Sequence, residues 1–253
     1  MTAPVLRPSN QGDFQPYAVI SRTGPHVTMQ AGVVQAGRFW TPTSASSLKA
    51  RSVRAHGQAS AVVVDGDETR ILSGRTVALR PLRPWRALED PVAGSLWALA
   101  VARLGRTHLD QLLGYVEASG SIPREWFPTR RVLLVTRIEH SLTLIDGAVT
   151  ETTGAWGGDT GPAPARSRSS SEDGVLPMAE LGDAHREVVD EDGRAHLGVD
   201  TPTGPVALPA RWLGGDRFSM SAPAFRAIRA DGDGRGPPCS TGARVVVPTR
   251  SWV

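Results

Sequence analysis

One stretch of the chain decides the fold: Gly37-Arg38-Phe39-Trp40-Thr41-Pro42-Thr43-Ser44-Ala45-Ser46-Ser47-Leu48-Lys49-Ala50-Arg51. Its first residues favour a β-strand that ends at Trp40-Thr41, and the hydroxyl-rich turn that follows leads into a helix predicted over residues 46–56. Ser44 or Ser46 is expected to cap this helix. A strand, a polar turn and a helix start in this order predict a site for an anion.

Phosphate is the anion that best suits this arrangement. Free backbone N–H groups and the positive end of the helix dipole attract a negative charge at the start of a helix. Four side chains of the turn can donate hydrogen bonds to phosphate oxygens, namely Thr43, Ser44, Ser46 and Ser47. Lys49 or Arg51 can supply the compensating charge. The alternative is an ordinary surface helix, in which a serine caps the first turn and both cations face solvent.

Predicted strands lie on both sides of this stretch. They are rich in Val, Ile, Thr or aromatic residues and cover residues 17–21, 26–34, 37–42, 60–65, 69–79 and 131–145. Gln35-Ala36-Gly37 and Asp65-Gly66-Asp67-Glu68 indicate short hairpin connections. Helical spacing of apolar residues predicts two further helices, over 90–104 and 107–118. The expected fold is mainly β (α+β), a small barrel of about six antiparallel strands with flanking helices.

The chain is expected to divide into two parts. Residues 154–174 are dominated by Gly, Pro, Ser and Asp, which is typical of a flexible linker. A main domain over 13–153 precedes this linker, and a small β-rich appendage over 175–228 follows it, with two strands around Thr201-Pro202-Thr203-Gly204. Residues 229–253 have no apolar pattern, and we expect them to be disordered.

Composition excludes several other classes of protein. The single cysteine, Cys239, cannot form an internal disulfide, and no cluster of ligands predicts a metal site. The longest weakly polar run, 94–102, is far shorter than the roughly 20 residues that span a bilayer. Residues 1–17 carry no secretory signal, so a cytoplasmic protein without a membrane association is expected. Sequence motifs of serine hydrolases, P-loop proteins and dinucleotide-binding folds are absent.

Charge is distributed unevenly along the chain, although the formal net charge is only +3. Residues 38–86 contain nine cations and three acids, whereas residues 172–200 contain nine acids and two arginines. The basic segment could meet an anionic partner, so a barrel that binds nucleic acid is one alternative. The tryptophans are too scattered to form a stacking platform for bases, which disfavours it. Lys49 is the only lysine among the 28 basic residues.

The order of these features resembles the flavin-binding split β-barrel superfamily. That group includes the pyridoxamine 5'-phosphate oxidase-like proteins and the actinobacterial flavin and deazaflavin oxidoreductases. The resemblance is carried by Phe39-Trp40-Thr41-Pro42-Thr43, the serine-rich turn, Lys49-Ala50-Arg51, the Asp65-Gly66 turn and Ser73-Gly74-Arg75. It covers residues 14–79 and extends more loosely over 126–145.

The resemblance implies that the strand, turn and helix hold the phosphate of FMN or of the deazaflavin coenzyme. The positions that match are Thr41, Thr43, Ser44, Ser47, Lys49 and Arg51. Trp40 is the aromatic candidate for packing against the cofactor ring, and the barrel core is its alternative place. His26 is a candidate for the cofactor groove or, alternatively, a turn or core residue.

The resemblance also implies an activity and an assembly. It predicts an oxidoreductase that acts on a small-molecule substrate, a homodimer, and no catalytic side chain beyond the cofactor itself. Arg137-Ile138-Glu139-His140 does not match the C-terminal motif of true pyridoxamine-phosphate oxidases, which disfavours vitamin B6 as the substrate. The alternative function is a non-catalytic protein that binds or senses a flavin or haem.

Overall fold

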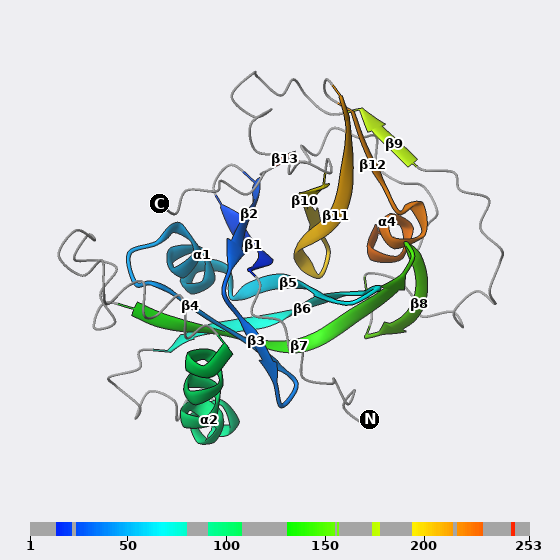
Figure 1. The fold of residues 1–253 in the computed structure, drawn as a ribbon. Helices are drawn as coiled ribbons and strands as arrows, with labels where there is room; N and C mark the ends of the chain where they lie inside the picture. Colours follow the sequence, from blue (N-terminus) through cyan, green and yellow to red (C-terminus); the bar gives the residue numbers. More distant parts are fainter. Residues whose placement is uncertain are drawn as a thin grey trace, which may run out of the picture.

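The protein consists of two β-sheets and a few helices (Figure 1). The computed structural model describes residues 14–21, 24–79, 91–107, 131–154, 156, 174–177, 194–214, 217–229 and 244–245. The strands of the larger sheet are β1 (Gln15–Ser21), β2 (Gly24–Gln30), β3 (Val33–Gln35), β4 (Arg38–Ser44), β5 (Gln58–Asp65), β6 (Glu68–Leu79), β7 (Arg131–Ile145) and β8 (Ala148–Thr153). Those of the smaller sheet are β9 (Gly174–Pro177), β10 (Arg194–Thr201), β11 (Gly204–Gly214), β12 (Arg217–Met220) and β13 (Arg244–Val245). The helices are α1 (Leu48–His56), α2 (Pro91–Thr107) and α4 (Ala222–Arg229).

The larger sheet has the strand order β2-β1-β5-β6-β7-β4-β3, and β8 pairs with β7 off this path. All of its strand pairs are antiparallel. The expected mainly β class with antiparallel strands is therefore confirmed. The sheet contains eight strands instead of about six, and it is not closed, because β2 and β3 remain at its two edges.

Both predicted hairpin connections are confirmed. Ala36 and Gly37 have φ values of 49° and 68° between the paired residues Gln35 and Arg38, as a type I′ turn requires. Gly66 supplies a φ of 61° between β5 and β6. The single strand predicted over 26–34 is wrong, because the structure has two strands there, separated at residues 31–32.

The helix after the polar turn begins later than predicted. Ser47, and not Ser44 or Ser46, is the N-cap, and its side chain accepts a hydrogen bond from the backbone N–H of Ala50 at 3.1 Å. Gly57 ends α1 in the left-handed conformation, with a φ of 66°. α2 confirms the helix predicted over 90–104. The helix predicted over 107–118 lies outside the described residues, apart from Thr107, the last residue of α2.

The larger sheet buries apolar side chains on both of its faces. One core lies between this sheet and α1, and it includes Tyr17, Val19, Phe39, Ala50, Val53, Ala59, Val132 and Leu134. Within it the rings of Tyr17 and Phe39 stack with centroids 5.8 Å apart. A smaller core joins the sheet to α2 through Trp40, Leu79, Ala100, Leu104 and Val135. The strand pattern of alternating faces thus places α1 and α2 on opposite sides of β4.

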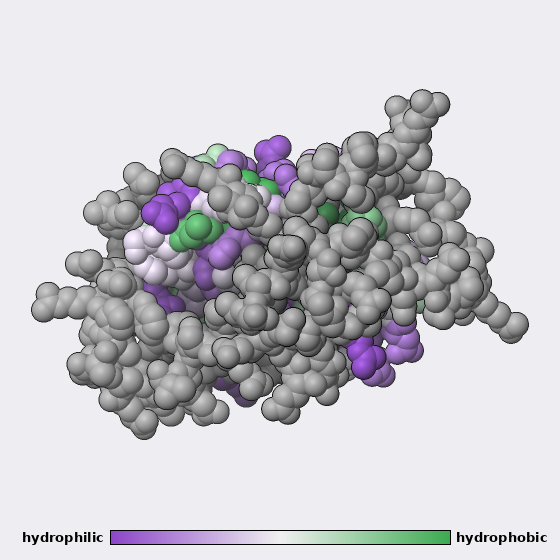
Figure 2. Space-filling model, turned by 90° about the horizontal axis from the view of Figure 1, so that it is seen from above, coloured by the Kyte–Doolittle hydropathy of each residue, from purple (hydrophilic) through white to green (hydrophobic). Residues whose placement is uncertain are grey.

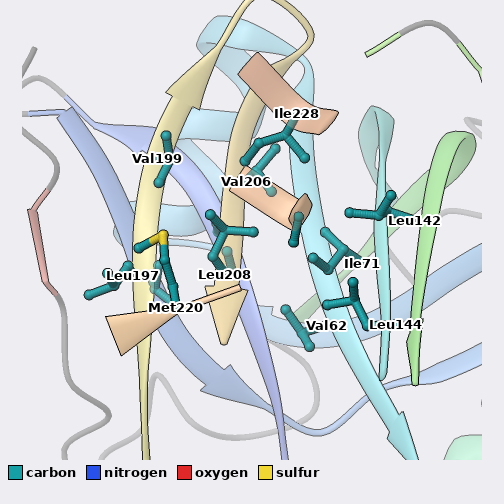
Figure 3. Close-up of a cluster of buried hydrophobic side chains, with 14 of the residues drawn as sticks. Val62, Ile71, Leu142, Leu144, Leu197, Val199, Val206, Leu208, Met220 and Ile228 are labelled. Carbon is teal, nitrogen blue, oxygen red and sulfur yellow. The ribbon is translucent and has the colours of Figure 1, made fainter. Parts of the chain in front are cut away.

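The smaller sheet confirms the predicted pair of strands around residues 201–204, since β10 and β11 pair from Arg194 to Thr201. Figure 3 shows that the smaller sheet shares a core with the larger sheet, on the face of the larger sheet opposite α1. Val62, Ile71, Leu142 and Leu144 face Leu197, Val199, Val206, Leu208, Met220 and Ile228. The backbone N–H of Ala207 donates to Ser60 Oγ at 3.0 Å, which ties β11 directly to β5.

Two features of this region differ from the sequence predictions. Trp156, inside the predicted linker, is only 3% exposed and packs in the shared core. Arg244 and Val245 pair with β10 as strand β13, which contradicts the disorder expected for these two residues. Gly154 follows β8, Gly174 opens β9 and Arg229 ends α4. The other residues of the predicted linker and tail lie outside the described residues. None of the described helices is long and apolar enough to cross a membrane.

Candidate anion-binding site

Lys49 lies in the first turn of α1, within electrostatic range of Arg131 and His26. Burial, and then the charge of Arg131, lower the pKa of the Lys49 ammonium to about 8. Burial, and then the charge of Lys49, lower the pKa of His26. His26, Lys49 and Arg131 are therefore close enough to interact electrostatically. We call these three residues the basic cluster.

Strand register brings the backbone of Arg131 and of His26 near the start of α1. Ser44, the last residue of β4, pairs with Arg131, the first residue of β7, so Arg131 lies beside the polar turn. His26 pairs with Val19 of β1, and Val19 packs in the core beneath α1. Because paired residues share a face of the sheet, the His26 side chain lies on the face that α1 covers, near Lys49.

The Lys49 ammonium has no acidic partner within the part of the chain that the structure describes. No hydrogen bond or ion pair joins it to a described residue, and the described ion pairs involve other cations. The side chain is only half-exposed, so solvent compensates its charge incompletely. A partly buried cation beside the further positive charge of Arg131 is the electrostatic setting that favours an anionic ligand.

The hydroxyl groups of the turn are already arranged around Ser47. Thr43 Oγ1 donates to Ser47 Oγ at 3.1 Å, and Ser47 Oγ also accepts from the backbone N–H of Ala50. Because a hydroxyl accepts two hydrogen bonds and donates one, the proton of Ser47 remains available for an anionic oxygen. Ser44 and Ser46 bind each other, with their Oγ atoms 2.9 Å apart.

The structure does not bring every predicted site residue to the basic cluster. Trp40 is fully buried against α2, and its indole N–H donates to the carbonyl of Gln35, so its packing supports the core alternative. Thr41 is also fully buried, and its hydroxyl donates to the carbonyl of Ala31 at 2.8 Å. Arg51 is exposed, two residues beyond Lys49 and therefore roughly 160° around the helix. Thr43, Ser44, Ser47 and Lys49 are the predicted residues that lie together.

Arg131 is the member of the site that sequence reasoning did not find. It follows Lys49 by 82 positions, and only the pairing of β4 with β7 places it beside the turn. The one usable sequence feature is that it opens a predicted strand of the same sheet. His26 was expected as a candidate for the cofactor groove, and the structure places it next to Lys49.

The surface around the start of α1 is mixed in character. Seen from above, the described residues on the α1 side of the molecule include hydrophilic surface beside a small hydrophobic area (Figure 2). Leu48, adjacent to Lys49, is an exposed apolar residue. No group of three or more His, Cys, Asp or Glu that could hold a metal occurs among the described residues.

Comparison with known proteins gives similarity in structure alone. No family model and no curated protein matches the sequence. Similar solved structures include a conserved hypothetical protein from Mycobacterium tuberculosis, with 18% identity over 54% of this chain and 79% of the other, at a TM-score of 0.37. A pyridoxamine 5'-phosphate oxidase-related, FMN-binding protein from Nostoc punctiforme has 14% identity over 53% and 74%, at 0.36. A FAD-binding protein from Mesorhizobium loti has 14% identity over 52% and 84%, at 0.33. These include proteins of the kind that the sequence resembles.

Proposed function

We propose that this chain binds FMN or the deazaflavin coenzyme by its phosphate, and that it is an oxidoreductase acting on a small molecule. The observation that carries the proposal is the half-buried Lys49 ammonium, which lies within electrostatic range of Arg131 and has no acidic partner among the described residues. A cation in this position is unfavourable unless an anion accompanies it. The sequence resemblance supplies the class of anion.

The donor set suits a phosphate ester. Lys49 contributes a point charge and Ser47 contributes a hydroxyl proton at the N-terminus of α1, where the helix dipole favours an anion. A bound flavin or deazaflavin would supply the hydride chemistry, while the chain holds and orients it. No side chain of the site is assigned as a general acid or base. The homodimer and the identity of the substrate stay predictions.

Titration with three ligands tests this proposal. FMN, riboflavin and the deazaflavin coenzyme are each added to the purified chain, and binding is followed by absorbance and fluorescence. FMN is expected to bind at least tenfold more tightly than riboflavin, because charge-assisted hydrogen bonds to the phosphate contribute about 1.5–3 kcal/mol. Equal affinities would show that the phosphate is not held, and a chain that binds none of the three would refute the cofactor. A loaded protein that exchanges no electrons with added donors or acceptors would support the non-catalytic alternative.

The affinity for FMN is expected to peak between about pH 7 and pH 8. Above the Lys49 pKa of about 8, the free protein loses the proton that phosphate binding requires, so affinity should fall by up to about tenfold per pH unit. Below the second phosphate pKa near 6, the ligand loses charge and affinity should also fall. Isothermal titration from pH 5.5 to 9.5 measures this profile. Riboflavin, which lacks the phosphate, is the control, and an FMN profile that matches it would contradict the assignment.

A further inference from the structure

Gln15 is a buried polar residue that the anion site does not explain. Its side chain is 3% exposed, and neither its Nε2 donor nor its Oε1 acceptor has a hydrogen-bond partner among the residues that the structure describes. A buried amide normally forms hydrogen bonds, because it loses those it would make with water. An amide with both ends unsatisfied therefore indicates a missing partner that offers both a donor and an acceptor.

The position of Gln15 relates it to the basic cluster. Gln15 pairs with Gln30 across β1 and β2, so the two side chains lie on the same face of the sheet. Thr28 and His26 follow at alternate positions of β2 and share that face. All three side chains on β2 are half-buried, and β2 is an edge strand. We call the three residues His26, Thr28 and Gln30 the β2 strip.

The β2 strip runs from a charged end to an amide end. His26 lies beside Lys49, and Gln30 lies opposite Gln15. The four-residue separation along an antiparallel strand corresponds to about 13 Å. A ring system joined to a phosphate by a short sugar-alcohol chain could lie along such a strip, with its phosphate at the basic cluster. The far edge of the ring would then reach the amide end.

The two glutamines at that end are not equivalent. Gln30 Nε2 already donates to the carbonyl of Met29, so its nitrogen is held by its own strand. Gln15 has both functions buried and unpaired among the described residues, an N–H donor and a C=O acceptor side by side. Their chemical complement is a ring carbonyl next to a ring N–H, which is an imide edge.

We propose that Gln15 recognises the imide edge of the pyrimidine portion of the cofactor ring. Its Nε2 donates to a ring carbonyl oxygen, and its Oε1 accepts from the adjacent ring N–H. This role rests on the proposed function, because the phosphate at Lys49 sets the direction in which the ring lies. It would make Gln15 a determinant of specificity for the ring, as Lys49 is for the phosphate.

The variant Gln15→Met tests this role, because it keeps the length of the side chain and removes the amide. Riboflavin and FMN are expected to bind this variant about threefold to tenfold more weakly, by the same factor for both ligands. The melting temperature of the ligand-free variant is expected to stay the same or to rise by a few degrees, because an unsatisfied buried amide is gone. Gln35→Met is the matched control, since Gln35 also has a buried side-chain oxygen with no partner in the described part of the chain but lies on β3. Its affinities should equal those of the parent.

A modified ligand gives a second measurement that does not depend on how the variant folds. 3-Methylriboflavin, in which a methyl group replaces the imide proton, is expected to bind the parent at least threefold more weakly than riboflavin. If the parent binds the two equally, or if Gln15→Met binds riboflavin as the parent does, the role of Gln15 is overturned. The preference of the parent for FMN over riboflavin would still stand in that case, and so would the phosphate site. If the parent binds no flavin, the proposed function fails and this role fails with it.

Discussion

Lys49→Ala is expected to bind FMN about tenfold to a hundredfold more weakly than the parent chain. The substitution removes one charge-assisted hydrogen bond to the phosphate, which contributes about 1.5–3 kcal/mol. Riboflavin should bind Lys49→Ala and the parent equally well, because it has no phosphate. Titration of both ligands into both proteins at pH 7.5 measures the difference. At this pH most of the Lys49 side chains still carry a proton, given their pKa of about 8.

The fold should tolerate this substitution. The pKa of Lys49 in the folded chain, about 8, lies below its ordinary value of 10.5, so the unfolded chain binds more protons between these two pH values. Stability therefore rises with pH across this window, and below it the charged side chain is a cost to the folded state. The ligand-free melting temperature of Lys49→Ala at neutral pH should equal or exceed that of the parent.

Arg51→Ala is the matched control for charge. It removes one positive charge from the same helix, but the exposed Arg51 side chain lies away from the basic cluster. FMN affinity should change by less than a factor of two, whereas Lys49→Arg should recover part of what Lys49→Ala loses. If Lys49→Ala binds FMN within a factor of two of the parent and melts at the same temperature, Lys49 is a solvated residue. The phosphate site would then have to be withdrawn.

Local chemistry made the strand, turn and helix around Lys49 predictable. The strand ends and the helix begins close to where the hydroxyl-rich segment indicated, because these tendencies depend on neighbouring residues. The exact cap was not predictable, since three serines within four residues can each accept the capping bond and Ser47 does so. The face of the sheet on which each strand side chain lies was equally unpredictable from the sequence. Trp40 and Thr43 lie on opposite sides of β4, and only the packing of α2 shows which side buries a large ring.

Long-range contacts account for most of what sequence reasoning missed. Arg131 joins the site through the register of β4 and β7, which no local pattern encodes. β8 pairs only with β7 and carries mostly exposed side chains, so its residues show no apolar alternation. Gly32, between β2 and β3, is required by the ring of Phe39, because a Cβ at this position would lie 2.2 Å from Phe39 Cζ. Such a contact is defined only once the strands have paired.

Leu208→Ala is expected to destabilise the whole chain by about 2–5 kcal/mol. Leu208 is fully buried on β11, in the core that the two sheets share, and its loss leaves a cavity against the larger sheet (Figure 3). Because that core includes Val62 and Ile71 of the larger sheet, both sheets should unfold in one transition. Urea unfolding followed by tryptophan fluorescence and circular dichroism measures the change.

The control for this substitution is Arg211→Ala on the same strand. Its side chain is exposed, so the free energy of unfolding should change by no more than about 0.5 kcal/mol. If the two parts of the chain on either side of the predicted linker, residues 154–174, folded independently, the urea unfolding curve would have a different form. Leu208→Ala would then produce an early transition for the smaller sheet, while the larger sheet kept the parent midpoint. Coincident fluorescence and dichroism curves, shifted together to lower urea, would instead show that β10 and β11 stabilise the larger sheet, on which α1 and Lys49 pack, through the contacts of Leu208 and the hydrogen bond from Ala207 to Ser60.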